Sequence, residues 1–300
     1  MKSVTIRVPA SAANLGPGFD CLALALDAIL EVTLSIEGVG LTVELAGEGA
    51  DRLPRNEENL VVRAARRVFS ASDFRPAGLR LRCSNAIPVG SGLGSSAAAA
   101  IAGLAAASWI LRGSLSDDLL AQAAELEGHA DNAAAAMLGG LVLAVPTRDG
   151  WIARHLPIAP MKVAIATPNL VLPTEAMREA LPSQVPLGDA SFNLSHLGLA
   201  LEAFRLGDYN LLAMALQDRL HEPYRAPHIP GLAQARRAAV DSGAAAAVLA
   251  GAGPSVLAFA AAGHQEIANA MESAFVRAGV PARSGVYSIA DQGLTIVTSS

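Results

Sequence analysis

The sequence predicts a fold of mixed helices and strands, either α+β or α/β. Segments with strand-like alternation and segments with helical periodicity follow one another along all 300 residues. Hydrophobic residues make up 52% of the chain and charged residues only 16%, which is ample material for a core. Aromatic residues make up only 4%, so alanine, leucine and valine must fill that core. The length suits one large or two medium domains.

The predicted strands alternate apolar and polar residues, or are short apolar runs between turn residues. They are residues 3–9, 22–36, 79–88, 141–146, 161–168, the two arms around the GAGP turn within 244–261, and 294–300. Between the first two, the stretch ASAANLGPGFD (10–20) breaks the alternation, and Gly16, Pro17 and Gly18 predict a loop there.

The predicted helices show apolar residues at helical spacing or dense alanine. They are residues 58–72, a helix that follows a glycine-rich turn and runs to about Leu111, and residues 115–128, 131–140, 174–182, 192–225 and 230–243. The segment 192–225 is predicted as two helices divided near Gly207. Asn59 lies near the start of the first helix, Ser116 and Thr174 are predicted caps, and Gly139 and Gly140 end the helix that begins at residue 131. Residues 97–111 form the longest apolar stretch, which is shorter than the about 18 residues of a membrane span. We therefore predict a buried helix there.

Composition excludes some classes of function. A net charge of −5 argues against a nucleic-acid partner, which requires clustered Lys and Arg. The N-terminal stretch MKSVTIRVPA lacks an apolar run of signal-peptide length, so we expect no membrane partner. Two cysteines, Cys21 and Cys83, do not suggest a disulfide framework and fit the reducing cytoplasm.

The stretch PVGSGLGSSAAAA (88–100) places three glycines and three serines directly before a strong helix former. Glycine costs roughly 0.5–1 kcal/mol relative to alanine inside an element, so the cluster needs a tight turn or a close approach of backbone to a ligand. The N-terminus of a helix presents unpaired N–H groups and about half a positive charge. Ser95 and Ser96 add hydroxyl groups, so we favour an anion site over a plain turn.

Two familiar nucleotide motifs do not fit this stretch. The P-loop requires a lysine after its last glycine, and none follows Gly94. Gly92, Gly94 and Ala97 match the dinucleotide fingerprint, but the acidic residue that it requires should end a strand. Asp117 and Asp118 lie at the right distance without a strand before them, so we interpret this match as accidental.

Three further polar groups could carry chemistry. Asn14 and Asp20 flank the glycine-proline turn, where an ordinary loop is the alternative. In LEGHADN (126–132), Glu127 or Glu125 could bind Mg²⁺, and a helix cap is the alternative.

The third group consists of Thr174, Arg178 and Arg225. Thr174 and Arg178 are four residues apart and so share a helix face. Arg178 and Arg225 could together hold one carboxylate, although each alone could be a surface salt bridge. The turn GAGPS (251–255) could be a hairpin or part of a phosphate loop.

Taken together, PASAANLGPGFD, PVGSGLGSSAAAA and LAGAGPSVLAF resemble the three ordered motifs of the galactokinase, homoserine kinase, mevalonate kinase and phosphomevalonate kinase (GHMP) superfamily. NLGPGFD, EGHADN followed by LGG, the T-x-x-x-R of residues 174–178, and LHEPYR resemble the homoserine kinases within it. The resemblance implies an α+β fold of two domains. Residues 1–152 would be a ribosomal-protein-S5-like ATP-binding domain, and residues 153–300 a ferredoxin-like domain that completes the substrate site.

The resemblance also implies a reaction, in which ATP with Mg²⁺ phosphorylates the side-chain hydroxyl of L-homoserine in threonine biosynthesis. A homodimer is common among such enzymes. A kinase acting on another small alcohol is the alternative, and a nucleotide-binding protein without catalysis is the alternative from a different class.

The implied roles fall on named residues. The ATP site would consist of Asn59 at the adenine and a phosphate cradle of Pro88, Val89, Gly90, Ser91, Gly92, Leu93, Gly94, Ser95 and Ser96. Ser95 and Glu127 would hold Mg²⁺. Arg178 and Arg225 would clamp the substrate carboxylate, and Asp20 and Asn132 would position its ammonium and hydroxyl groups, with Thr174 and Asn14 close by. Asp20, Asn132 and Asn14 would be the catalytic residues, without an assigned general base.

Overall fold

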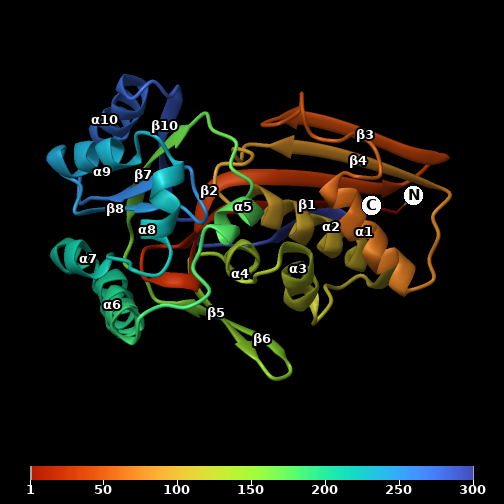
Figure 1. The fold of residues 1–300 in the computed structure, drawn as a ribbon. Coiled ribbons are helices and arrows are strands. Elements are labelled where there is room, and N and C mark those ends of the chain that lie inside the picture. Colours follow the sequence, from red (N-terminus) through yellow and green to blue (C-terminus); the bar gives the residue numbers. More distant parts are fainter. Residues whose placement is uncertain (1, 300) are drawn as a thin grey trace.

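The computed structural model describes residues 2–299 and builds them into two sheets with helices packed on them. Figure 1 shows the larger sheet with α1–α4 on one side of it, and the smaller sheet with α9 and α10 at the other end of the molecule. This is the two-part α+β architecture that the resemblance implied.

The larger sheet has seven strands, and its main path runs β11-β1-β2-β4-β3. Its strands are β1 (Lys2–Asn14), β2 (Gly18–Ile36), β3 (Gly40–Gly47), β4 (Gly78–Asn85), β5 (Leu141–Thr147), β6 (Gly150–Leu156) and β11 (Thr295–Ser299). Neighbouring strands are antiparallel except β3 and β4, which are parallel and are connected through α1 (Leu60–Ala71). The long hairpin of β1 and β2 is the centre of this sheet.

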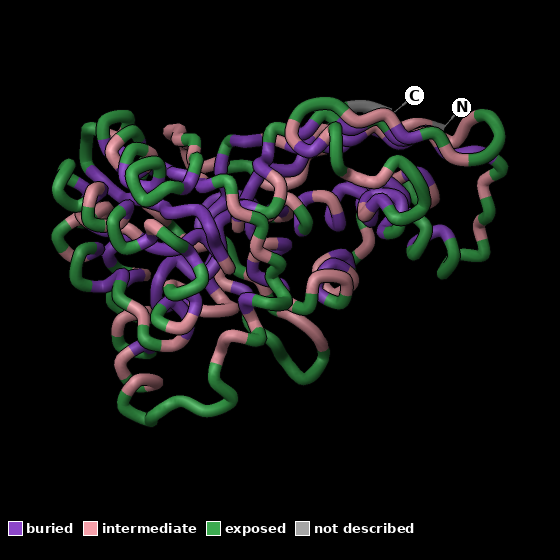
Figure 2. The backbone as a smooth tube through the Cα atoms, turned by 45° about the horizontal axis from the view of Figure 1, so that its top comes forward, coloured by how far each residue is buried: buried purple, intermediate pink, exposed green. Residues whose placement is uncertain are grey.

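One face of the larger sheet is covered by α1, α2 (Ser95–Arg112), α3 (Leu119–Glu127) and α4 (Asp131–Leu138). By length and composition α2 could cross a membrane, but 67% of it is buried inside the fold, which makes it a core helix. Figure 2 shows buried backbone in the interior of both parts of the molecule, with exposed segments at the periphery. The predicted buried helix over residues 97–111 is therefore confirmed.

The smaller sheet contains β7 (Lys162–Pro168), β8 (Ala246–Leu249), β9 (Val256–Phe259) and β10 (Ala282–Ser288), all antiparallel. Together with α9 (Leu232–Asp241) and α10 (His264–Arg277) they follow the order β-α-β-β-α-β. The strands lie in the sheet as fourth, first, third and second, which is the ferredoxin-like arrangement.

Four helices and a 3₁₀ helix lie in the chain between β7 and α9. They are α5 (Thr174–Glu179), α6 (Leu187–Leu206), α7 (Tyr209–Ala215), α8 (Glu222–Arg225) and the 3₁₀ helix Ala226–His228. Helix α5 is near the middle of the molecule, and α6 and α7 are at the lower left of Figure 1. The predicted division near Gly207 is confirmed, because Gly207 is the left-handed C-cap of α6.

Some predicted elements differ from the structure. Residues 10–14 and 18–20 are not a loop but the ends of β1 and β2, since the polar residues there are buried against other motifs. The helices predicted to begin at Ser116 and Thr174 are capped by Asp118 and Pro173 instead. Ser116 lies further out and hydrogen-bonds the carboxylate of Asp118.

Strands β3, β6 and β10 and helix α10 were not predicted. The predicted boundary after residue 152 lies within β6, and β11 returns to the larger sheet from the far end of the chain. The last residue of the predicted strand 294–300 lies outside the described residues.

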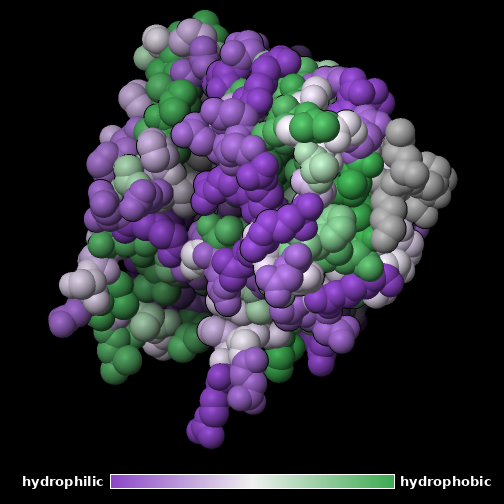
Figure 3. Space-filling view, turned by 90° about the vertical axis from the view of Figure 1, so that its right-hand side faces the viewer, coloured by the Kyte–Doolittle hydropathy of each residue, from purple (hydrophilic) through white to green (hydrophobic). Residues whose placement is uncertain are grey.

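The surface mixes polar and apolar residues. Figure 3 views the end that carries β3, β4 and α1, where polar side chains surround a smaller group of apolar ones. A chain with 52% hydrophobic residues cannot cover its whole surface with polar groups, so such a mixture is expected.

Candidate active site

The three glycine-containing motifs meet at a cavity of about 310 Å³. Every residue predicted for ATP, substrate or metal lines this cavity except Pro88. The carbonyl of Pro88 instead accepts a 2.7 Å hydrogen bond from the Ser91 hydroxyl and so shapes the turn. The fold thus gathers residues from 14 to 253 around one space.

The glycines of the second motif serve both a turn and a close approach. Gly92 and Gly94 have φ of 81° and 71°, in the left-handed region that favours glycine. A Cβ on Gly92 would lie 2.2 Å from the carbonyl oxygen of Ala250, and one on Gly94 would lie 2.2 Å from the Ser11 hydroxyl. Backbone hydrogen bonds join the same motifs, from Ser11 N to Leu93 O and from Ser255 N to Ser91 O. The glycines therefore let three backbones pack together at the site.

Helix α2 begins at this turn and directs its N-terminus at the cavity. Gly94 is its N-cap and has no side chain to satisfy the first N–H groups, and Ser95 and Ser96 in the first turn also line the cavity. Unpaired amides and the helix dipole attract anions, and an 18-residue helix develops the dipole fully. A Cβ on Gly90 would meet nothing within 4 Å, so the backbone is open there. This geometry suits a phosphate chain.

An apolar wall lies beside the glycine turn. Its members are carbon-rich side chains from β3, β4, the segment before α1 and the first turn of α1: Leu45, Leu53, Pro54, Leu60, Val61 and Cys83. Asn59 lies in this wall, but its amide is engaged within the protein. Its Oδ1 accepts from Val61 N at 3.0 Å and its Nδ2 donates to Pro54 O at 2.9 Å. Asn59 is therefore the N-cap of α1 in this structure.

Of the two glutamates that sequence left open, only Glu127 faces the cavity. It accepts a 2.7 Å hydrogen bond from the Ser96 hydroxyl, and burial raises the pKa of its carboxyl. Glu125 forms an ion pair with Arg67 at the surface, with 62% of its side chain exposed. The sequence pointed to Ser95 as the neighbour of Glu127, whereas the hydroxyl that contacts it belongs to Ser96.

A carboxylate and hydroxyl groups are the hard oxygen donors that Mg²⁺ prefers. Within residues 2–299 there is no group of three or more His, Cys, Asp or Glu side chains that could hold a metal ion. The donor set of Ser95, Ser96 and Glu127 fits Mg²⁺ only as an ion that is also held by phosphate oxygens and water, which is its usual mode of binding.

Asp20 and Arg178 form a two-pronged ion pair across the cavity. Arg178 donates from Nη1 to Oδ2 at 2.9 Å and from Nη2 to Oδ1 at 2.7 Å. The hydrogen bonds from Arg178 to Asp20 raise the pKa of the guanidinium. About a third of each side chain is exposed, 35% for Arg178 and 36% for Asp20, so a ligand can reach both.

The turn of the first motif is held by Asn14. Its Oδ1 accepts from Asp20 N at 3.0 Å, and its Nδ2 donates to Gly251 O at 2.8 Å in the third motif. Asn14 and Asp20 adopt φ of 71° and 56°, and Asn and Asp tolerate this left-handed region better than most residues. Backbone strain at a ligand cavity is typical of a functional site.

At the start of α4, Asn132 and Asp131 approach the same space. The Ser11 hydroxyl donates to Asn132 Oδ1 at 3.0 Å. Asp131 is buried and lies 2.8 Å from His129 Nδ1. Burial opposes a charged imidazole, but the hydrogen bond and charge of Asp131 outweigh it and raise the pKa of His129. Neither of these two residues was assigned to the site from the sequence.

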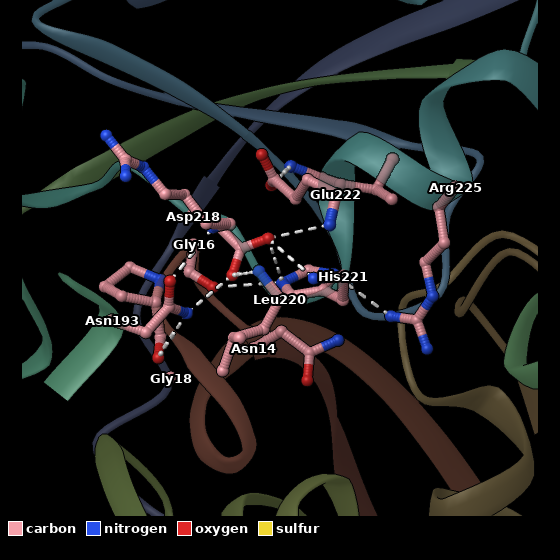
Figure 4. A network of polar contacts seen from close by, with 12 residues as sticks. Asn14, Gly16, Gly18, Asn193, Asp218, Leu220, His221, Glu222 and Arg225 are labelled. Atoms are coloured by element: carbon pink, nitrogen blue, oxygen red, sulfur yellow. Dashed lines mark hydrogen bonds and ion pairs between the residues drawn. The ribbon is translucent and has the colours of Figure 1, made fainter. Parts of the chain in front are cut away.

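Arg225 lies almost wholly buried, at 1% exposure, at the end of α8. It donates from Nε to Met177 O at 3.3 Å and from Nη1 to Gly251 O at 3.2 Å. Figure 4 shows the polar network behind it, which includes His221 and Asp218. Sequence reasoning missed these two residues, although LHEPYR contains the histidine.

Comparison with known proteins shows which protein family this chain matches. Residues 59–140 match the model of the GHMP kinases N terminal domain, and residues 200–277 match GHMP kinases C terminal. The homoserine kinase of Moorella thermoacetica is 42% identical over 277 residues, which cover 92% of this chain and 93% of that protein. The homoserine kinase of Carboxydothermus hydrogenoformans is 39% identical and covers 93% of this chain and 92% of its own.

Solved structures agree. The crystal structure of homoserine kinase from Cytophaga hutchinsonii matches with a TM-score of 0.86 and 32% identity, covering 98% of this chain and 97% of that one. Mevalonate kinase of L. major in complex with R-mevalonate shares the fold at a TM-score of 0.66 and 15% identity, covering 96% of this chain and 94% of its own. The chain belongs to the GHMP kinases and, within them, to the homoserine kinase family of enzymes.

Proposed function

We propose that this chain transfers the γ-phosphoryl group of ATP to the side-chain hydroxyl of L-homoserine, which gives ADP and O-phospho-L-homoserine for threonine biosynthesis. One observation carries the proposal: a single cavity joins the N-terminus of α2 to a pair of arginines and a carboxylate. The helix N-terminus suits a polyphosphate. The arginines and the carboxylate suit an amino acid, which carries a negative carboxylate and a positive ammonium group.

ATP would lie with its phosphates over residues 89–96 and its base against the apolar wall. The N–H groups of the first turn of α2 and the backbone beside Gly90 support this placement. The adenine contact that the resemblance assigned to Asn59 would run through its backbone or its carbon atoms, because its amide groups are engaged.

Homoserine would place its carboxylate between Arg178 and Arg225, since both guanidinium groups line the cavity. Its ammonium would then meet Asp20, and its hydroxyl would lie near Asn132, Asn14 and Thr174. The ion pair between Asp20 and Arg178 has the same charges that a zwitterionic substrate presents. Binding would therefore exchange one salt bridge within the protein for two with the ligand.

Glu127 would hold Mg²⁺ together with Ser95 or Ser96, and the ion would neutralise charge on the phosphates when bound. The substrate oxygen forms its bond to the γ-phosphorus and releases its hydroxyl proton as the bond to the bridging oxygen of ADP breaks. Such transfers pass through a loose transition state and depend on positioning and charge stabilisation more than on a strong base. We therefore assign Asp20, Asn14 and Asn132 to orientation and leave the general base unassigned.

We also propose that residues 1–152 bind ATP and that residues 153–300 complete the substrate site. The proposed location is the cytoplasm, and the proposed assembly is a homodimer. Substrate residues come from both parts, with Asp20 and Asn132 in the first and Arg178 and Arg225 in the second. This distribution supports a site completed by the C-terminal part.

A coupled assay of ADP release with Mg-ATP tests the function. L-Homoserine is compared with serine, threonine, mevalonate and galactose. Turnover on homoserine far above the other alcohols is the expected result. Turnover on another alcohol alone would preserve the phosphate site but overturn the substrate, and ATP binding without turnover on any of them would favour a nucleotide-binding protein.

A further inference from the structure

The guanidinium group of Arg225 makes three polar contacts within the protein, and these contacts fix its orientation in the cavity. Nε and Nη1 donate to the carbonyls of Met177 and Gly251, and Nη1 also lies 3.2 Å from Nδ1 of His221. Among residues 2–299, no group accepts a hydrogen bond from its Nη2, which leaves that edge of the fork for a ligand. The direction of the free edge therefore depends on how Nε and Nη1 are held.

The contact with His221 fixes the protonation of the imidazole. A guanidinium N–H can only donate, so His221 Nδ1 must present its lone pair to Arg225. The opposite nitrogen, Nε2, lies 3.0 Å from the carbonyl oxygen of Gly16, which can only accept. Both contacts require one neutral tautomer with its proton on Nε2. Complete burial, at 0% exposure, also disfavours the charged imidazolium and lowers the pKa of His221.

His221 is itself fixed by the segment before α8. The Asp218 carboxylate, fully buried, accepts from the backbone N–H groups of Leu220 at 3.1 Å, His221 at 2.9 Å and Glu222 at 2.7 Å. It also accepts from Asn193 Nδ2 at 2.7 Å. These contacts bring α6, α8 and the first motif together, as Figure 4 shows.

The first residue of α8, Glu222, is tied to the third motif. Glu222 accepts from Leu249 N at 2.7 Å and forms an ion pair with Arg236 at 2.5 Å. The Phe19 ring stacks on His221, with centroids 5.3 Å apart, and lies 5.4 Å from the Arg225 guanidinium carbon. The imidazole is therefore fully buried and stacked on an aromatic ring, and each of its two nitrogens has a polar partner.

We infer that His221 is a positioning residue: through its unprotonated Nδ1 it orients Arg225 toward the substrate carboxylate, and through Nε2–H it ties that arginine to the turn that carries Asp20. This inference rests on the proposed function. It assigns to His221 no contact with substrate. The role predicts that loss of the Nδ1 acceptor weakens binding of homoserine while ATP binding stays as it was.

Two amide substitutions separate the two nitrogens. His221→Asn places a carbonyl oxygen near the position of Nδ1, and His221→Gln places an N–H near that of Nε2. Loss of a hydrogen bond to a charged group corresponds to roughly a tenfold to hundredfold change in binding. We expect His221→Gln to raise KM for homoserine by this factor, with KM for ATP unchanged. His221→Asn should hold KM for homoserine within about threefold of the parent.

His228 provides the matched control, because it is an exposed histidine in the 3₁₀ helix that follows α8. His228→Gln should leave both KM values unchanged. The inference is overturned if His221→Gln binds homoserine as well as the parent, or if the two His221 variants raise both KM values equally and lower Tm together. The latter result would mean that the histidine serves the fold alone.

The parent protein offers a test without any substitution. A two-bond ¹H–¹⁵N spectrum of the histidine side chains distinguishes the two neutral tautomers, and we expect the Nε2–H form for the most buried ring. A ring protonated on Nδ1 contradicts the inference directly. If the parent does not phosphorylate homoserine at all, the proposed function fails, whereas the tautomer still reports on the geometry of Arg225.

Discussion

Arg178 and Asp20 meet along both edges of their planar groups, at 2.7 and 2.9 Å, so a carboxylate of the chain itself fills the fork that would receive a substrate carboxylate. The two residues are 158 positions apart in the sequence and come from α5 and β2. Bidentate pairs of this kind are both stronger and more directional than single hydrogen bonds. In the proposed site, a substrate carboxylate would replace Asp20 at Arg178, and the substrate ammonium would then pair with Asp20.

Asp20→Asn tests this exchange. The amide neither competes fully for Arg178 nor requires an ammonium, so selection against compounds without an amino group should weaken. We expect the preference for homoserine over 4-hydroxybutanoate, as a ratio of kcat/KM, to fall by about tenfold or more. A ratio that stays at the parent value would show that Asp20 does not read the ammonium group.

The two arginines predict a separate effect. Arg178→Ala and Arg225→Ala should each raise KM for homoserine by roughly tenfold to hundredfold, because each removes a charge-assisted hydrogen bond. KM for ATP should stay near the parent value. Arg205→Ala is the control, since Arg205 pairs with Glu202 on the surface of α6. Unchanged homoserine kinetics in both variants would contradict the clamp.

Gly92→Ala and Gly90→Ala distinguish backbone strain at a positive φ from a steric clash between the new Cβ and the neighbouring loop. Both positions have positive φ, 81° and 69°, which costs an L-residue roughly 1–2 kcal/mol. Only at Gly92 would the new Cβ also collide with the backbone, at the carbonyl of Ala250. Gly92→Ala should therefore lower Tm more than Gly90→Ala and raise KM for ATP. Equal losses in both variants would mean that the close approach of the two loops is unimportant.

Glu127→Gln and Glu125→Gln lie on the same helix and test the metal site. Only Glu127 faces the cavity, so only its loss should raise the Mg²⁺ concentration needed for half-maximal activity. We expect kcat at saturating ATP to fall by on the order of a hundredfold in Glu127→Gln, as for removal of one group that stabilises transition-state charge. A matching loss in Glu125→Gln would place the metal elsewhere.

His129 gives stability a dependence on pH. The pKa of this histidine lies above its ordinary value of 6.5, so its pairing with Asp131 contributes fully below pH 6.5 and is lost as pH rises through the raised value. The Tm difference between the parent and His129→Gln should be larger at about pH 6 than at about pH 9. A difference that grows with pH would reverse the sign of the linkage and contradict this pair.

Local sequence patterns predicted much of the fold and the glycine-rich turn at the centre of the site. The glycine cluster before an alanine-rich helix predicted a tight turn, and the structure has one there, with α2 beginning at Ser95. Helices with clear periodicity, such as α1 and α9, lie where they were predicted. The first motif was predicted to be a loop because Gly16, Pro17 and Gly18 break the alternation, whereas the strands run to Asn14 and restart at Gly18, and Asn14 is buried in contact with the third motif.

The remainder depends on contacts that adjacent residues cannot reveal. His221 and Gly16 are 205 positions apart, and Asn193 and Pro17 are 176 apart, so no local pattern marks them as partners. The cap residues Asp118 and Pro173 were missed by two residues or fewer, which is the usual uncertainty of a helix end. Ser96 rather than Ser95 contacts Glu127 because the rotation of the first turn of α2 decides which hydroxyl faces α3.

The pairing of β11 with β1 determines when the larger sheet can be completed during synthesis of the chain. Val4 lies opposite Ser299 in the sheet, so the outer edge of the first strand stays open until the residues of β11 have been made. At about 5–20 residues per second, this delay is on the order of tens of seconds on the ribosome. During that time the exposed edge can pair with another chain. A nascent-chain experiment should therefore find the larger sheet complete only once β11 has left the ribosome, a step that follows the exit of β10, the last strand of the smaller sheet.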